Sequence, residues 1–444
     1  MGVLLQRFYY NCPLKQNREF EWWNFINEKL PQIASDGFTA LWLPPANKAA
    51  NIFGMSMGYD PYDYYDLGEF DQRGSVKTWF GSRQELETLI NESHAKGLQV
   101  YADFVFNHNS GADETEVNPL DGQARWTKFN PKSNKFARNW ECFHPSIFDT
   151  YDNERFAGMP DLCHRNPYVY QNLIDVARWL IEDVGFDGFR YDFVKGYGSW
   201  FIASLQDIRY FKKGKEHRIY GVGELWNSED AIQNWLIETN NFSDNPVSAF
   251  DFPLRYTLKE MCDSFGFRMT RLAELETLTK VRPQWSVTFV DNHDFDQFGE
   301  TIINDKLLAY AYILTHEGYP CVFWYDYFNL ELAREGTPNG IQALIGVHEK
   351  YAAGPSTILY VDNDLYIMQR HGLHSIPGMV IAINNRGDAW KGSVVQTEWI
   401  NRTLQPIAWD SSIDKSLPLF KVTDDHGRTD LWAPPRGYVV YVPV

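Results

Sequence analysis

The sequence predicts an α/β fold, a (β/α)8 barrel of the TIM type with an inserted domain after its third strand and an all-β C-terminal domain. Three observations predict it. Eight short, nearly continuous apolar runs recur through the first three quarters of the chain, helical patterns lie between them, and two segments break this alternation. Apolar strands of this kind are typical of sheets buried on both faces, and strands alternating with helices form parallel barrels.

The expected strands occupy residues 3–10, 39–43, 99–105, 188–192, 219–225, 249–254, 286–290 and 321–325. Between them, the runs 85–94, 170–184 and 306–315 have helical patterns. In the second of these helices, Leu173, Ile174, Ala177 and Leu180 fall on one face, and Pro167 stands near its start, where proline is favoured.

Two segments interrupt the pattern. Residues 106–164 are rich in Asn, Asp, Gly and Pro and are too long for an ordinary loop, so we expect an inserted metal-binding domain there. Residues 356–444 consist of short apolar runs separated by turn-forming residues, which indicates a C-terminal β-sandwich domain. The catalytic barrel is then formed by residues 1–105 and 165–355.

Composition narrows the class of protein. The formal net charge is −17 with a pI near 5.1, which disfavours nucleic-acid binding because phosphates require a cationic surface. A neutral polysaccharide makes no such demand, and spare carboxylates suit a hard cation such as calcium. Aromatic residues make up 16% of the chain, which fits either a large core or flat surfaces that stack on sugar rings.

The N-terminus has no secretion signal, and no apolar stretch is long enough to span a bilayer. The five cysteines are scattered and odd in number, so no disulfide framework is expected. As the sequence stands, we expect a soluble cytoplasmic monomer with no membrane partner. A secreted protein with a trimmed N-terminus would look the same.

Polar residues gather where the expected strands end. Barrel enzymes build their active sites at the carboxyl ends of the strands, and acidic groups at that end of three strands converge on one mouth. The residues in question are Asp103, Asn107 and His108, then Arg190 and Asp192, then Glu224, and finally Asn292, His293 and Asp294.

Four segments resemble the signature regions of the α-amylase family of retaining glycoside hydrolases. They are ADFVFNH at 102–108, GFRYDFVKG at 188–196, GELW at 223–226 and FVDNHD at 289–294. MPDL at 159–162 and GYDPYDYYDLG at 58–68 resemble two further motifs. The resemblance covers nearly the whole chain in the right order, and it implies endo-acting hydrolysis of α-1,4-glucosidic bonds in starch-type glucans.

The resemblance assigns Asp192 as nucleophile, Glu224 as acid/base and Asp294 as transition-state stabiliser. Retention requires the first two carboxyls about 5–5.5 Å apart, and neighbouring strands lie about 4.8 Å apart, so two residues that end consecutive strands could meet this spacing. Arg190 lies two residues before Asp192, on the same side of the strand, and should keep that carboxylate ionised. Crowding by other carboxylates should raise the pKa of Glu224.

The remaining substrate-binding residues also come from the resemblance. His108 and His293 would bond the sugar in the cleavage subsite, Tyr59 would form a stacking platform, and Lys195 would reach the leaving-group side. Trp226 would provide a further sugar contact, with plain packing as the alternative.

Calcium is the expected cofactor. By resemblance, its ligands would be the side chains of Asn107, Asp152 and Asp161 and the backbone carbonyls of Gly196 and Glu154. Such a set mixes carboxylates with carbonyls, as calcium prefers. Zinc is a second hypothesis, since some archaeal relatives use a His and a Cys at the places of His144 and Cys163, but Asp149 stands where they have a further His. Buried free thiols are the alternative.

Two rival functions remain open. The family also contains transglycosylases with the same three carboxyls, and a non-catalytic glucan-binding protein could share the barrel. Such binding proteins usually lose one member of the triad, whereas Asp192, Glu224 and Asp294 are all present here. Phe295 stands where the family often has Thr, which concerns the shape of the cleft and not the reaction.

Overall fold

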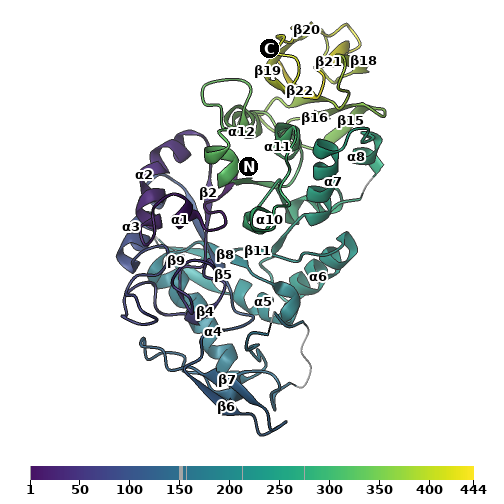
Figure 1. The fold of residues 1–444 in the computed structure, drawn as a ribbon. Helices are drawn as coiled ribbons and strands as arrows, with labels where there is room; N and C mark the ends of the chain where they lie inside the picture. Colours follow the sequence, from purple (N-terminus) through teal and green to yellow (C-terminus); the bar gives the residue numbers. More distant parts are fainter. Residues whose placement is uncertain (1, 150–153, 157, 213, 275) are drawn as a thin grey trace.

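Eight parallel strands close into a barrel, as the sequence predicts (Figure 1). The computed structural model describes residues 2–149, 154–156, 158–212, 214–274 and 276–444. Around the barrel each strand pairs in parallel with its neighbours, and the first strand closes the ring against the second and the last. In chain order the strands are β1 Leu4–Gln6, β2 Ala40–Leu43, β5 Gln99–Phe104, β8 Gly188–Tyr191, β11 Tyr220–Gly223, β12 Ser248–Phe250, β13 Ser286–Phe289 and β14 Tyr319–Phe323.

The sixth strand is shorter than expected. The sequence predicts a strand over 249–254, but β12 ends at Phe250 and helix α7 runs over Phe252–Asp263. Asp251 causes the switch, because its carboxylate accepts a hydrogen bond from the backbone N–H of Leu254 and so caps the helix. Pro253 then occupies the first turn, where its missing N–H costs nothing.

Helices surround the barrel (Figure 1). The expected helix 85–94 is α3, which begins after a capping box formed by Ser82 and Glu85, and the expected helix 170–184 is α4 with a π-helical last turn, η2 Leu180–Val184. The longer helices are α2 Trp22–Ser35, α3 Arg83–Ala95, α4 Pro167–Trp179, α5 Ser199–Gln206, α6 Glu229–Asn241, α7, α11 Lys306–Thr315 and α12 Ile341–Lys350. The short ones are α1 Cys12–Lys15, α8 Thr270–Glu274, α9 Leu278–Val281, α10 His293–Phe298, η1 Trp140–Cys142, η3 Val194–Gly196, η4 Pro283–Trp285 and η5 Tyr325–Asn329.

The segment between β5 and β8 projects from one end of the molecule (Figure 1). It contains an antiparallel hairpin, β6 Glu114–Val117 with β7 Ala124–Lys128. Its two ends are held together where His108 bridges Asp161, so the insertion leaves and rejoins the barrel at one place. Two smaller hairpins also lie outside the barrel, β3 Lys48–Ala49 with β4 Pro61–Asp63 and β9 Arg209–Lys212 with β10 Lys215–Arg218.

The C-terminal part is all β, as expected, and lies at the opposite end of the molecule from the β6–β7 hairpin (Figure 1). One face of its main sheet, including Met368 and Ile381, joins the core of the barrel, and the other face, including Ile367 and Val380, forms a second core. This alternation is typical of an antiparallel sheet covered on both sides. The sheet order is β15-β16-β17-β22-β19-β20, with a separate pair β18–β21; the bounds are β15 Ser356–Val361, β16 Leu365–Arg370, β17 Met379–Asn384, β18 Lys391–Gln396, β19 Thr403–Ser411, β20 Lys421–Val422, β21 Arg428–Ala433 and β22 Gly437–Pro443.

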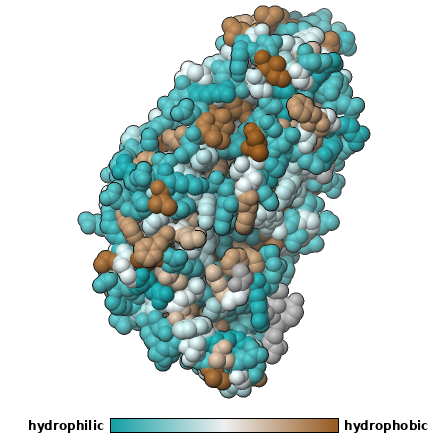
Figure 2. Space-filling view, viewed as in Figure 1, coloured by the Kyte–Doolittle hydropathy of each residue, from teal (hydrophilic) through white to brown (hydrophobic). Residues whose placement is uncertain are grey.

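The surface is mostly hydrophilic on the face shown in Figure 2, where apolar side chains form small separate patches. Among the described residues, every helix is too short or too polar to cross a membrane. The five cysteines are buried and form no disulfide with one another.

Candidate functional site

The strand ends bring the predicted carboxyls to one mouth of the barrel. Asp103 lies opposite Arg190 in the register of β5 and β8, and the backbone N–H of Glu224 bonds to the carbonyl of Tyr191, so β5, β8 and β11 end side by side. Asp294 reaches the same mouth from the first turn of α10, which begins after Asn292 accepts hydrogen bonds from two backbone N–H groups.

Arg190 joins three carboxylates. Its Nη1 lies 2.8 Å from Asp103 Oδ1 and 2.6 Å from Asp192 Oδ1, and its Nη2 lies 2.9 Å from Glu224 Oε2. All four side chains are largely removed from solvent. One guanidinium therefore faces up to three negative charges, and the cluster is stable at neutral pH only if some carboxyls keep their protons.

The carboxyl pKa values follow from this crowding. Burial raises the pKa of Asp192 to about 7 even though Arg190 opposes the shift. Burial, together with the charges of Asp192 and Asp294, raises the pKa of Glu224 to about 8. The expectation of a raised Glu224 pKa is met. Arg190 lowers the pKa of Asp192, as expected, but burial outweighs this attraction and the net shift is upward, so the expectation that Arg190 keeps Asp192 ionised is not met.

The backbone that follows Asp192 also forms a hydrogen bond with the side chain of Glu224. Phe193 has a left-handed conformation, with φ of 46°, which a bulky side chain rarely adopts. This turn points its N–H at Glu224 Oε2, 3.2 Å away. The strained residue thus links the two carboxyls that the sequence assigns to the reaction, and Tyr197 adds a hydrogen bond from its hydroxyl to the carbonyl of Asp192.

The two histidines are buried and neutral. Burial lowers the pKa of His108 and of His293 to about 4. Tyr59 stacks on His293, with ring centres 5.1 Å apart, and donates its hydroxyl to Asp103. His108 is less accessible than expected, because its Nε2 bonds to the carbonyl of Tyr59 and its ring stacks on Phe156.

Lys195 and Trp226 already have protein partners. Lys195 forms an ion pair of 2.7 Å with the carboxylate of Glu154. Trp226 stacks on Phe252 and donates its indole N–H to the hydroxyl of Tyr256. Its ring is partly buried, so the structure leaves room for both packing and a sugar contact.

Three polar residues of the mouth have contacts there but no role assigned from the sequence. Asp103 accepts hydrogen bonds from Arg190, Tyr59 and the indole of Trp42. Gln6, at the end of β1, lies 3.0 Å from Nδ1 of His293. The sequence places Asp103 at its strand end, and the same rule applied to β1 and β2 identifies Gln6 and Trp42, which carry no charge.

The proposed calcium ligands meet only in part among the described residues. Asn107 Oδ1 is buried with no hydrogen-bond partner, and it lies 2.1 Å from where a side chain on Gly196 would begin. The backbone of Asp161 forms a β-bridge with that of His108, the residue next to Asn107. Asp161 Oδ2 lies 2.7 Å from Nδ1 of His144. Asp152 lies outside the described residues, and no cluster of three His, Cys, Asp or Glu suited to a metal occurs among the described ones.

His144 and Cys163, the two residues of the zinc hypothesis, lie within hydrogen-bonding distance of each other. Burial lowers the pKa of His144, but hydrogen bonds to Asp161 and Cys163 outweigh this and raise it to about 10. Among the described residues, His144 thus bonds to both Asp161 and Cys163.

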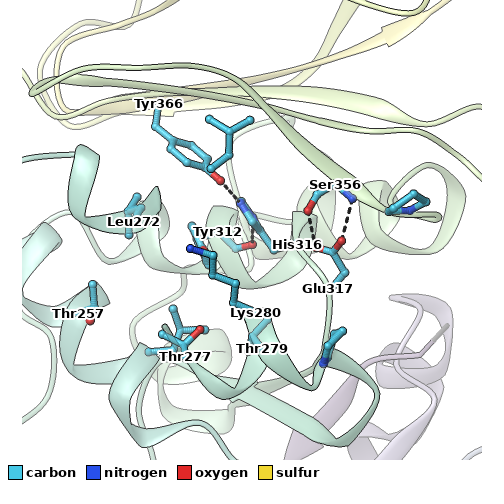
Figure 3. Close-up of a pocket in the computed structure, with 14 residues that line it drawn as sticks. Thr257, Leu272, Thr277, Thr279, Lys280, Tyr312, His316, Glu317, Ser356 and Tyr366 are labelled. Atoms are coloured by element: carbon cyan, nitrogen blue, oxygen red, sulfur yellow. Dashed lines mark hydrogen bonds between the residues drawn. The ribbon is translucent and has the colours of Figure 1, made fainter. Parts of the chain in front are cut away.

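A cavity of about 430 Å³ lies away from this mouth, between the barrel helices and the C-terminal sheet (Figure 3). The hydroxyl of Tyr366 in β16 forms a hydrogen bond with Nε2 of His316, and the carboxylate of Glu317 accepts a hydrogen bond from the hydroxyl of Ser356. The cavity shares no residue with the carboxyl cluster, and its polar groups bond to one another. It therefore belongs to the contact between the two domains.

Comparison with known proteins agrees with this geometry. The α-amylase catalytic domain family matches residues 17–327, and the α-amylase C-terminal family matches residues 379–442. An α-amylase of Geobacillus stearothermophilus is 33% identical over 82% of this chain and 75% of its own length. The cytoplasmic α-amylase of Escherichia coli K12 is 28% identical over 90% of this chain and 92% of its own.

Solved structures show the same fold. The α-amylase of Geobacillus thermoleovorans, solved as a complex with acarbose, superposes with a TM-score of 0.69 at 21% identity, over 100% of this chain and 98% of that one. The catalytic family model spans well over half of this chain. The protein therefore belongs to the α-amylase family of glycoside hydrolases.

Proposed function

We propose that this enzyme hydrolyses internal α-1,4-glucosidic bonds of starch, glycogen and malto-oligosaccharides with retention of configuration. The observation that carries the proposal is the shared guanidinium of Arg190, which bonds to both Asp192 and Glu224. Two carboxyls bonded to one planar guanidinium lie only a few ångströms apart, as the two-step displacement requires.

In the first step, the carboxylate of Asp192 attacks the anomeric carbon while Glu224 donates its proton to the leaving oxygen. A glycosyl ester on Asp192 forms and the glucosidic bond breaks. In the second step, Glu224 takes a proton from water, the water oxygen attacks the anomeric carbon, and the ester is cleaved. The raised pKa of Glu224 suits a group that must hold a proton near neutral pH.

Asp294 lies across the mouth from this pair and interacts with both carboxyls. In the proposed mechanism it holds sugar hydroxyls and stabilises the positive charge of the oxocarbenium-like transition state. Neutral His293 and the ring of Tyr59 line the same subsite, where an uncharged imidazole can donate a hydrogen bond to a sugar hydroxyl.

Calcium is the cofactor that the α-amylase family generally requires, and we propose that this chain binds it at the base of the insertion. The buried, unpartnered Oδ1 of Asn107 fits an ion that takes oxygen ligands only. Asp161 and the backbone of Gly196 would complete the described part of the site, with Asp152 and the carbonyl of Glu154 as further ligands. The bound ion would hold the insertion against the barrel beside the cleft.

We further infer an intracellular setting. The five cysteines remain thiols, as is usual in reducing compartments, and one relative is named a cytoplasmic α-amylase.

The test is the division of labour between Asp192 and Glu224. Asp192→Asn and Glu224→Gln should both lose most starch-cleaving activity. A maltosyl fluoride needs little help to lose its leaving group, so Glu224→Gln should form the glycosyl-enzyme and stall. Azide, which needs no general base, should restore turnover and release a sugar azide of retained configuration.

Mass spectrometry of each variant after brief exposure to the fluoride provides the readout. An adduct on Asp192→Asn would contradict the assignment of the nucleophile. Transglycosylation is the runner-up function, and chromatography of starch products separates it from hydrolysis, since transfer lengthens some chains without a matching release of reducing ends.

A further inference from the structure

The segment that carries His293 and Asp294 is held by a side chain from a neighbouring element. We call residues 290–300 the α10 loop, because they run from the end of β13 through α10. Arg255 lies on α7, which follows β12, the strand next to β13 in the barrel. Its side chain is 0% exposed, so its charge must be satisfied entirely by the protein around it.

Arg255 bonds to both ends of the α10 loop. Its Nε donates to the carbonyl of Val290 at 3.2 Å, and its Nη2 donates to Asp291 Oδ1 at 2.8 Å. The same Nη2 donates to the carbonyl of Glu300 at 2.6 Å. Val290 and Asp291 precede α10 and Glu300 follows it, so one guanidinium closes the loop. Because its donors point in fixed directions, these bonds set how far apart the two ends of the loop lie.

The face of the same guanidinium lies on the ring of Phe295. Cζ of Arg255 is 3.4 Å from the centre of that ring, and a cation is attracted to an aromatic face most strongly when both are removed from water. Phe295 is fully buried and immediately follows Asp294 in the first turn of α10. The contact therefore fixes the turn from which Asp294 reaches the mouth.

Phe295 also contacts the segment that follows Glu224. The ring of Trp226 meets that of Phe295 edge to face, with ring centres 4.8 Å apart. The indole N–H of Trp226 in turn bonds to the hydroxyl of Tyr256, the residue next to Arg255. Phe295 thus packs between the segments that carry Glu224 and Asp294. In a closely packed interior, such a side chain sets the distance between the two segments.

The charges behind this contact balance one another. Asp291 bonds to Arg255 on one side and to Lys306 on the other, each at 2.8 Å, and it accepts the backbone N–H of Ile302 at 3.0 Å. Lys306 also pairs with Asp326 at 2.6 Å. Two cations therefore face two carboxylates, all of them buried. A buried ionic network with every charge paired is costly to rearrange, so it holds Arg255 in one place.

We propose that Arg255 is a positioning residue that acts through Phe295 and sets where the carboxylate of Asp294 stands relative to Glu224. The proposal rests on the proposed function, in which Asp294 stabilises the transition state. That carboxylate must meet the charge that develops at the anomeric carbon, and a misplacement of about 1 Å can cost about 100-fold in rate. Arg255 therefore affects the chemical step, although it touches no substrate.

The test compares kcat and KM of Arg255→Met and Phe295→Leu on starch and on maltosyl fluoride. Each variant should lower kcat about tenfold on both substrates and leave KM nearly unchanged, because an interaction made only in the transition state is weakened. The double variant should lose less than the product of the two single losses, since both residues act through one contact. Phe295→Leu leaves every buried charge paired and carries the test if Arg255→Met does not fold.

Arg436→Met is the matched control for lost stability. Arg436 is also buried, pairs with Asp305 at 2.6 Å and donates to the carbonyl of Met261 at 3.2 Å. These partners lie outside the α10 loop. Arg436→Met should lower the melting temperature about as much as Arg255→Met does and keep the parent kcat, measured where all variants are folded. Arg255→Lys keeps the charge beside Asp291 but lacks the planar fork, and it should recover part of the lost kcat.

Three results would overturn the proposal. They are a parent-like kcat in Phe295→Leu, a raised KM with kcat unchanged, and an equal loss of kcat in Arg436→Met. Asp294→Asn separates this failure from failure of the proposed function. If Asp294→Asn keeps the parent kcat on starch, the proposed role of Asp294 is wrong. If it loses activity while Arg255→Met and Phe295→Leu do not, only the positioning role of Arg255 is refuted.

Discussion

Replacing Arg190 by Met should destabilise the protein in a pH-dependent way. The guanidinium is buried and bonds to Asp103, Asp192 and Glu224 at 2.6–2.9 Å. Methionine preserves most of the volume and removes the charge. Removal of one partner from a buried ion pair costs about 3–5 kcal/mol, and here one cation serves three carboxyls, so we expect the upper part of that range at pH 8.

The sign of the pH dependence follows from the raised carboxyl pKa values. Burial holds the pKa of Asp192 at about 7 and of Glu224 at about 8 in the folded protein, against about 4 for both when unfolded. The folded state therefore binds more protons between about pH 4 and 8, and the free energy of unfolding falls as pH rises through this window. Without Arg190 the folded pKa values rise further, which steepens that fall.

The measurement is urea unfolding of parent and Arg190→Met at pH 5 and pH 8. The difference in unfolding free energy should be small at pH 5, where the carboxyls hold their protons, and largest at pH 8. Arg190→Lys is the control, since it keeps the charge but cannot bond to three groups in a planar fork, and it should fall between the two. An equal loss at both pH values would refute the electrostatic account and leave lost packing as the cause.

Three further predictions concern acid/base chemistry, metal and orientation. The kcat/KM for starch should fall as pH rises through about 8, where Glu224 loses its proton, and fall below about 7, where Asp192 gains one; a flat profile from pH 7 to 10 would contradict this. Chelation should lower the melting temperature and added calcium should restore it, because an ion that binds only the folded state stabilises it. Asn107→Ala should abolish most of the rise in melting temperature that calcium gives. Asn109→Ala, which loses a hydrogen bond to the carbonyl of Pro61, is the control and should keep that rise. Gln6→Met should lower kcat about tenfold by releasing His293 from its hydrogen bond. Gln6→Glu should instead raise the pKa of the His293 imidazole, which an NMR titration of the histidines would detect. An unchanged titration in Gln6→Glu would show that the contact does not orient the ring.

Much of the fold was predictable because strand and helix periods are local properties. Runs such as 99–105 and 188–192 are apolar enough to be buried on both faces, and they are strands β5 and β8. The prediction was wrong at the end of the sixth strand, because the hydrogen bond from Leu254 to Asp251 decides where β12 stops. Asp251 and Pro253 are helix-start signals that the apolar residues around them outweighed in the prediction.

The sequence by itself determined which residue types stand at the ends of the barrel strands, and hence the resemblance to the α-amylase family. Chain order places Asp192 and Glu224 on consecutive strands, and parallel pairing then brings them together. Only the tertiary structure decided what each side chain meets: the single guanidinium between three carboxyls, and the covering of His108 by Phe156. The reason is physical, since period and pairing follow from the backbone and its neighbours along the chain, whereas burial, pKa and hydrogen-bond satisfaction depend on groups that are distant in sequence.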